Sequence, residues 1–84
     1  MKQSRLAEKQ GLTFTERHRL ETLPAEIEKL EAEIAKLEVY LSAPDLYQQA
    51  PLKFQKASAA LVERQTALQS AEDEWLRLEE KNAS

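Results

Sequence analysis

Basic side chains near the N-terminus are the residues whose types and spacing best fit a chemical role. Residues 1–20 hold five basic and two acidic side chains, which gives this segment a net charge of +3. A cluster of this kind attracts phosphate backbones through release of counterions, without reading bases. The candidate nucleic-acid contacts in it are Lys2, Arg5, Lys9, Arg17, His18 and Arg19. The alternative is a linker that only keeps the chain in solution.

Two lysines farther along the chain, Lys53 and Lys56, form a second candidate contact. The remainder of the chain is unfavourable for phosphate, because residues 21–84 hold seven basic and thirteen acidic side chains, a net charge of −6. Nucleic acid bound to this chain must therefore sit locally, at the N-terminal end or at these lysines. Such contacts are independent of base sequence.

The other polar residues do not form a catalytic or metal-binding pattern. His18 is the single histidine and the chain has no cysteine, so the usual partners for a metal site are missing. The carboxylates are spaced along the flanks of expected helices, where water screens them and nothing raises a pKa for acid–base work. We therefore expect a non-catalytic chain without a cofactor of its own.

The aromatic residues have two possible roles. Trp75 could stack on a base, but its expected place opposite Leu20 favours a role in the core. Tyr40, Tyr47 and Phe54 gather around the expected loop. They form either a small cluster that closes the loop or an exposed platform for stacking.

Apolar residues at coiled-coil spacing define the elements that must position these side chains. The first stripe has intervals of 3 and 4 and comprises Leu20, Leu23, Ile27, Leu30, Ile34, Leu37 and Leu41. The second, weaker stripe comprises Phe54, Ala57, Leu61, Leu68, Ala71, Trp75 and Leu78. The pattern predicts an all-α fold, a monomeric antiparallel two-helix coiled-coil hairpin over 12–80. We expect a flexible basic linker at 1–11, helix 1 at about 14–42, a loop at 43–51, helix 2 at about 52–80 and a tail at 81–84.

Local signals refine these boundaries. Thr13 and Glu16 fit a capping box at the start of helix 1. Pro24 must kink or break that helix, because proline lacks the N–H and clashes with the carbonyl four residues back. We expect a short helix at roughly 14–22 and a long one from 24. Asp45 is a plausible cap for a single turn with Leu46 and Tyr47.

The register of the hairpin follows from pairing apolar with apolar residues. In an antiparallel hairpin the numbers of facing residues add to a constant, and a sum near 95 places Ile34 opposite Leu61 and Leu20 opposite Trp75. The same sum places Glu31 beside Arg64, and a sum of 94 places Glu38 beside Lys56. Complementary charges on the flanks of the seam favour this pairing.

Four segments resemble a known family in the same order along the chain. They are Leu12-Thr13-Phe14, similar to L-S-Y; Leu20-Glu21-Thr22-Leu23-Pro24, similar to E-L-E-x-L-P; Pro44-Asp45-Leu46-Tyr47, similar to D-P-D-F-Y; and Glu74-Trp75-Leu76-Arg77-Leu78-Glu79, similar to R-W-E-E-L-E. Together they resemble the C-terminal coiled-coil domain of Uup-type ABC-F ATPases over residues 12–80. Two departures thin the positive charge: the family's Arg in Q-R-E-L-E falls on His18, and the Arg before its Trp is Glu74.

The resemblance implies an accessory domain of a bacterial ATPase whose two cassettes, with their ATP and Mg²⁺, lie upstream of this segment. It implies DNA, including branched DNA, or RNA and the ribosome as partners, together with the parent's own cassettes. The alternative is a coiled-coil module that docks on protein or ribosome without touching DNA. No apolar run reaches the ~18 residues that span a bilayer, and the first ten residues lack a signal core. We therefore expect a cytoplasmic location.

Overall fold

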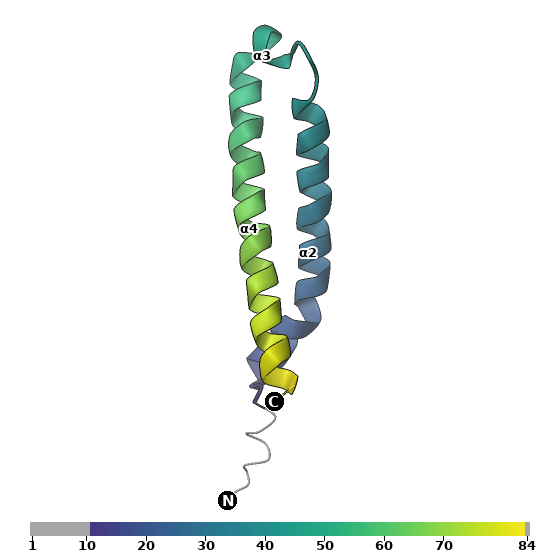
Figure 1. Cartoon of the computed structure of the whole chain (residues 1–84), viewed down its shortest axis with the longest axis vertical. Coiled ribbons are helices and arrows are strands. Elements are labelled where there is room, and N and C mark those ends of the chain that lie inside the picture. The colour runs from purple at the N-terminus through teal and green to yellow at the C-terminus, as the bar shows by residue number, and fades with distance from the viewer. Residues whose placement is uncertain (1–10, 84) are drawn as a thin grey trace, which may run out of the picture.

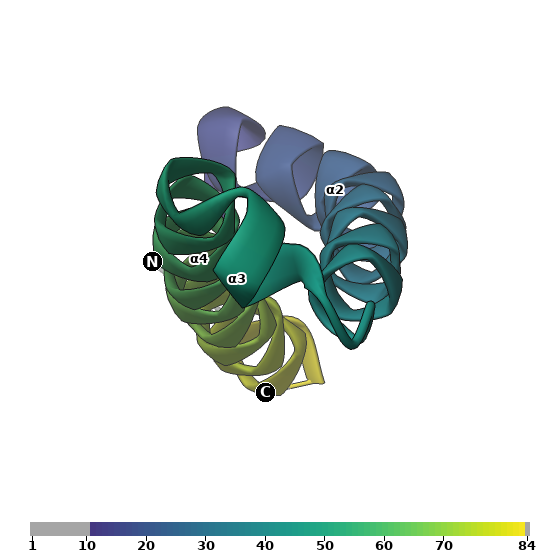
Figure 2. The ribbon, with the colours of Figure 1, turned by 90° about the horizontal axis from the view of Figure 1, so that it is seen from above.

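A computed structural model describes residues 11–83, and all secondary structure in that range is helical. The helices are α2 (Phe14–Leu41), α3 (Leu46–Gln49) and α4 (Pro51–Ala83). Figure 1 shows α2 and α4 running antiparallel along one rod, with α3 at its closed end. Viewed down the axis in Figure 2, the two long helices lie side by side and α3 covers the end of α4. The predicted all-α helical hairpin is confirmed.

The start of α2 is fixed by the predicted capping box. The Glu16 N–H donates to Thr13 Oγ1 at 3.1 Å, and the Thr13 N–H donates to Glu16 Oε1 at 3.0 Å. Each side chain thus satisfies a backbone N–H that has no partner within the helix. The helix begins at Phe14, one residue after its cap.

Pro24 lies inside α2, and the helix continues through it as one element of 28 residues. The expected restart as a second helix therefore does not occur. Figure 1 shows the first turns of α2 bent toward the end of α4, at an angle to the long upper part. A bend at proline relieves the clash of its ring with the Leu20 carbonyl. One turn earlier, the Thr22 hydroxyl donates to the Arg19 carbonyl at 3.2 Å.

At the closed end of the rod the elements follow in the predicted order, but the predicted cap of the short helix is not made. Asp45 stands at the N-cap of α3, but its side chain makes no capping hydrogen bond. Ala50 has an extended φ of −143°, as expected for a residue before proline, and Pro51 opens α4 in the first turn where its missing N–H has no cost.

At the other end α4 runs to Ala83, beyond the helix end expected at 80. Lys81 lies in its last turn, where a cation interacts favourably with the helix dipole. Its Nζ also donates to both carboxylate oxygens of Glu16, at 2.9 and 3.1 Å. Lys81, the first residue of the expected polar tail, is therefore helical and contacts α2.

The core is concentrated at the end of the rod that holds the kink. Leu23 is fully buried there, and Ala71 and Leu78 from α4 are 4% and 7% exposed. Partly buried apolar side chains surround these three: Leu12, Leu20, Ile27, Leu30 and Trp75. Leu20 and Trp75 thus belong to the same cluster, and the predicted role of Trp75 in the core is confirmed.

Ion pairs between the helices report the register. Arg64 on α4 bonds to Glu33 at 2.9 Å, a pair whose numbers add to 97, and Arg19 bonds to Glu74, a sum of 93. These values bracket the predicted 95. The predicted partner of Arg64, Glu31, was wrong in detail, because Glu31 lies two residues from Glu33 and hence on the exposed side of α2. The expected pair of Glu38 with Lys56 is not formed in the described range.

Candidate nucleic-acid interface

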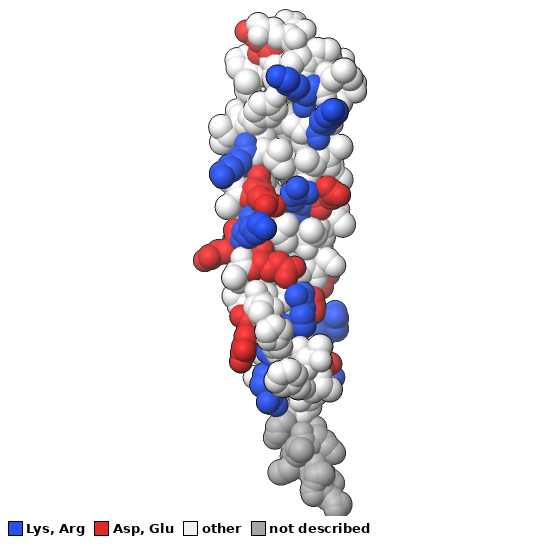
Figure 3. Space-filling model, turned by 180° about the vertical axis from the view of Figure 1, so that it is seen from behind, with Lys and Arg blue, Asp and Glu red and all other residues white. Residues whose placement is uncertain are grey.

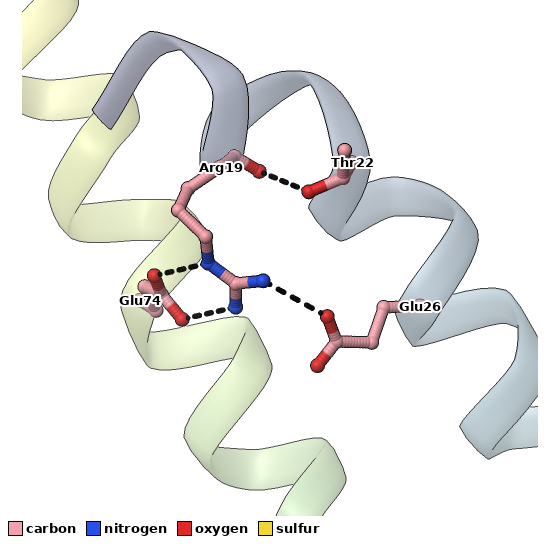
Figure 4. Close-up of polar contacts among 4 residues, drawn as sticks. All are labelled: Arg19, Thr22, Glu26 and Glu74. Carbon is pink, nitrogen blue, oxygen red and sulfur yellow. Dashed lines mark hydrogen bonds and ion pairs between the residues drawn. The ribbon is translucent and has the colours of Figure 1, made fainter. Parts of the chain in front are cut away.

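Arg19, a predicted phosphate contact, is held by two carboxylates instead. Figure 4 shows its guanidinium between Glu74 of α4 and Glu26 of α2. Nε and Nη2 donate to the two oxygens of Glu74 at 2.8 and 2.6 Å, and Nη1 donates to Glu26 Oε1 at 3.2 Å. The bidentate pair joins the two helices, and the bond to Glu26 spans the bend at Pro24. Two carboxylates compensate the charge of Arg19, which makes it a structural residue.

The same contacts shift pKa values. The hydrogen bond from Arg19 lowers the pKa of Glu74, and the one from Lys81 lowers the pKa of Glu16. A carboxyl with a lowered folded-state pKa releases its proton more readily in the folded than in the unfolded chain. The two ion pairs therefore stabilise the folded chain at a pH above the ordinary pKa of a glutamate. This stabilisation is lost as the pH falls through the lowered pKa of each carboxyl. Both contacts accordingly hold the kinked end together at neutral pH.

Two other predicted residues at this end, Arg17 and His18, are exposed and make no ion pair in the described range. Phe14 lies one turn before His18 and is 82% exposed. Arg17 and His18 therefore remain available to a ligand. The other predicted contacts of the N-terminal segment, Lys2, Arg5 and Lys9, lie outside the described residues.

The surroundings of Arg17 and His18 are acidic. We call the kinked end, residues 11–26 with 71–83, the base. It holds four basic and eight acidic residues, a net charge of −4. A groove of about 490 Å³ beside Pro24 has Glu72 and Asp73 on its wall, next to Trp75 and Leu76. Folding thus brings carboxylates of α4 to the base. The electrostatic potential there is negative, whereas the charge of residues 1–20 alone predicted a positive one.

The tip, which we define as residues 39–62, has the opposite character. It contains three charged residues, Asp45, Lys53 and Lys56, and hence a net charge of +1. Both lysines are exposed and have no acidic partner among the described residues. Figure 3 shows acidic atoms at the very top of the rod and basic side chains a little below them, whereas acidic and basic side chains are mixed along its middle. The tip is therefore a described surface whose charged residues sum to a positive charge.

Aromatic and aliphatic side chains accompany these lysines at the tip. The rings of Tyr47 and Phe54 meet edge to face with centroids 5.3 Å apart, which matches the predicted cluster that closes the loop. Tyr47 is nonetheless 60% exposed and Tyr40 is 42% exposed, so the cluster does not bury its tyrosines. Val39 and Leu52 are exposed as well, at 72% and 70%.

The exposure of Val39 and Leu52 at the tip was not predicted from the sequence. A signal was present in the sequence, because residues 39–62 hold few charges while the flanking segments are densely charged. Low charge with exposed apolar side chains is typical of a contact surface.

The described residues also bear on metal binding and on membrane insertion. No group of three or more His, Cys, Asp or Glu residues that could hold a metal ion occurs within residues 11–83. In the same range, neither long helix is apolar enough over a sufficient length to cross a membrane.

The described residues form a small coiled-coil hairpin with a charged rod and a tip that exposes apolar side chains and two lysines. Its sequence matches the family model of the ABC transporter C-terminal domain over residues 11–80. The chain belongs to that family, which agrees with the resemblance to the C-terminal domain of Uup-type proteins. It is thus an accessory domain of an ABC protein. Comparisons with curated proteins and with solved structures give no match.

Proposed function

We propose that this chain is the nucleic-acid-binding accessory domain of a Uup-like ABC-F ATPase in the bacterial cytoplasm. In this proposal the parent's cassettes hold ATP and Mg²⁺ and perform hydrolysis, and the hairpin supplies contacts to DNA or RNA. The family match and the order of the four resembling segments support the parent assignment.

The observation that carries the binding proposal is the pair of uncompensated lysines at the tip. Lys53 and Lys56 are three residues apart on α4, so they lie on one face of the helix about 4.5 Å apart along its axis. Phosphate groups that meet them displace condensed counterions, which favours binding at low salt. At the base, by contrast, Arg19 is already neutralised and a net charge of −4 disfavours a phosphate backbone.

The basic N-terminal segment provides a second contact in this proposal. Lys2, Arg5 and Lys9 precede the exposed residues Arg17 and His18 in the sequence. These residues add phosphate contacts of the same sequence-independent kind, and Arg17 and His18 lie in the first turns of α2, at the other end of that helix from the tip.

The exposed aliphatic side chains of the tip favour a second candidate function. Val39 and Leu52 are the kind of surface that a protein partner buries. In this alternative the tip docks on the ribosome or on the parent's cassettes without direct contact to DNA.

Charge reversal at the tip tests the binding proposal. Lys53→Glu with Lys56→Glu should weaken binding of labelled duplex DNA, and the slope of log affinity against log salt should become shallower by roughly 1.8, or 0.9 for each lost contact. Fluorescence anisotropy at several salt concentrations measures both quantities.

The matched control is Lys29→Glu with Lys36→Glu, which makes the same charge change at two exposed positions of α2. The control should leave affinity and slope much closer to those of the parent chain. Equal losses in the two double variants would show that only net charge matters and would contradict a site at the tip. Unchanged binding in the tip variant would move the contact to the N-terminal segment.

A further inference from the structure

We propose that the tip binds unpaired nucleotides, with a base stacked on Tyr47 and the adjoining phosphates held by Lys53 and Lys56. This inference rests on the proposed function and makes it specific. It assigns single-stranded nucleic acid, or an unpaired segment next to a duplex, as the ligand of this end of the hairpin.

Tyr47 has the geometry of a stacking platform. It lies on α3, and its ring meets Phe54 of α4 at an interplanar angle of 77°. In an edge-to-face contact one ring places its edge against the face of the other. The ring that contributes its edge keeps both of its faces free of that contact. Because Tyr47 is 60% exposed, whereas Phe54 is only partly exposed, the available aromatic surface belongs to Tyr47. A preoriented ring loses little conformational freedom when a base stacks on it.

The charges around this ring suit a nucleotide. Lys53 is the direct neighbour of Phe54 in the sequence, and Lys56 lies one turn farther along α4. Both ammonium groups lack an acidic partner in residues 11–83, and the single acid of the tip, Asp45, directly precedes α3, two residues before Tyr47. A nucleotide presents an apolar π face and an anionic phosphate close together, which is the combination that an exposed aromatic ring beside two lysines recognises.

The same surface fits a duplex less well. In a duplex the faces of the bases are stacked on one another, and uncovering one costs a few kcal/mol before it can meet a side chain. An unpaired base offers its face without that cost. Tyr40, which also belongs to the tip, is 42% exposed, and such a ring offers contact area to a base and nothing to a phosphate backbone. The tip should therefore prefer a single strand.

Paired substitutions at Tyr47 test this inference with the complete 84-residue chain. Tyr47→Leu keeps an apolar side chain against Phe54 but removes the aromatic face, and Tyr47→Phe keeps the face and removes the hydroxyl. Affinities for a labelled oligothymidylate and for a labelled duplex are measured by anisotropy, and the thermal unfolding midpoint of each variant is recorded. The matched control is Phe14→Leu, which removes an exposed aromatic ring at the base.

The inference predicts that the parent chain binds the oligothymidylate more tightly than the duplex. Tyr47→Leu should weaken single-strand binding by roughly 5- to 150-fold, the measured range for loss of one stacked base. Tyr47→Phe, Phe14→Leu and all duplex affinities should change little. Equal single-strand affinity of the parent chain, the Leu variant and the Phe variant would overturn the stacking site while leaving the proposed function intact. Failure of the parent chain to bind either probe would overturn both, and would favour a protein partner for the tip.

Discussion

Replacing Leu23 with alanine should lower the free energy of unfolding by about 2–5 kcal/mol, the usual cost of truncating a fully buried leucine. Leu23 has no exposed surface and contacts the centre of the core at the base. In a hairpin this small the loss is a large fraction of total stability, so thermal or urea unfolding followed by circular dichroism should show a clear shift of the midpoint.

The control for this prediction is Leu52→Ala, the same substitution at a side chain that is 70% exposed. Its effect should stay within about 0.5 kcal/mol, as for most surface positions. Similar shifts for the two variants would mean that the kinked end is not the centre of stability.

Enlarging Ala71 should destabilise the hairpin by overpacking the core, whereas the Leu23 variant leaves a cavity in it. Ala71 is 4% exposed and packs in the same core as Leu23, so there is little room for three more carbon atoms. Ala71→Leu should cost about 1–3 kcal/mol through overpacking. The exposed Ala67 provides the matched control, because Ala67→Leu adds the same atoms to the solvent side of α4. A neutral Ala71→Leu in urea unfolding would contradict close contact of the helices at this point.

Much of the fold could be predicted from the sequence because its signals are local or periodic. The two apolar stripes predicted the two long helices and the Thr13–Glu16 spacing predicted the first cap, whereas α4 begins at Pro51, one residue before the expected position. The pairing of the two helices was predicted to within two residues, because few alignments of the helices bury both apolar stripes at the same time.

The candidate site was harder to predict because its charges depend on partners distant in the sequence. Arg19 looks free within residues 1–20, yet its partner Glu74 is 55 residues away and reaches it only in the folded hairpin. The departure of Glu74 from the family's arginine was a clue, since it supplies the carboxylate that Arg19 binds. The extension of α4 through Lys81 likewise depends on Glu16. The low charge of residues 39–62 indicated a contact surface at the tip, but the exposure of each ring could not be predicted, because the clustering of Tyr40, Tyr47 and Phe54 does not determine which ring stays exposed.

We propose that the tip, and not the acidic base, is the described surface that meets nucleic acid. The most direct test of this proposal is a map of amide chemical-shift changes in the isotopically labelled chain when oligothymidylate is added at low salt. We expect the largest chemical-shift changes within residues 39–62, around Tyr47, Lys53 and Lys56. These changes should become smaller as salt is added. Changes confined to residues 11–26 and 71–83, with the tip unaffected, would contradict the proposal.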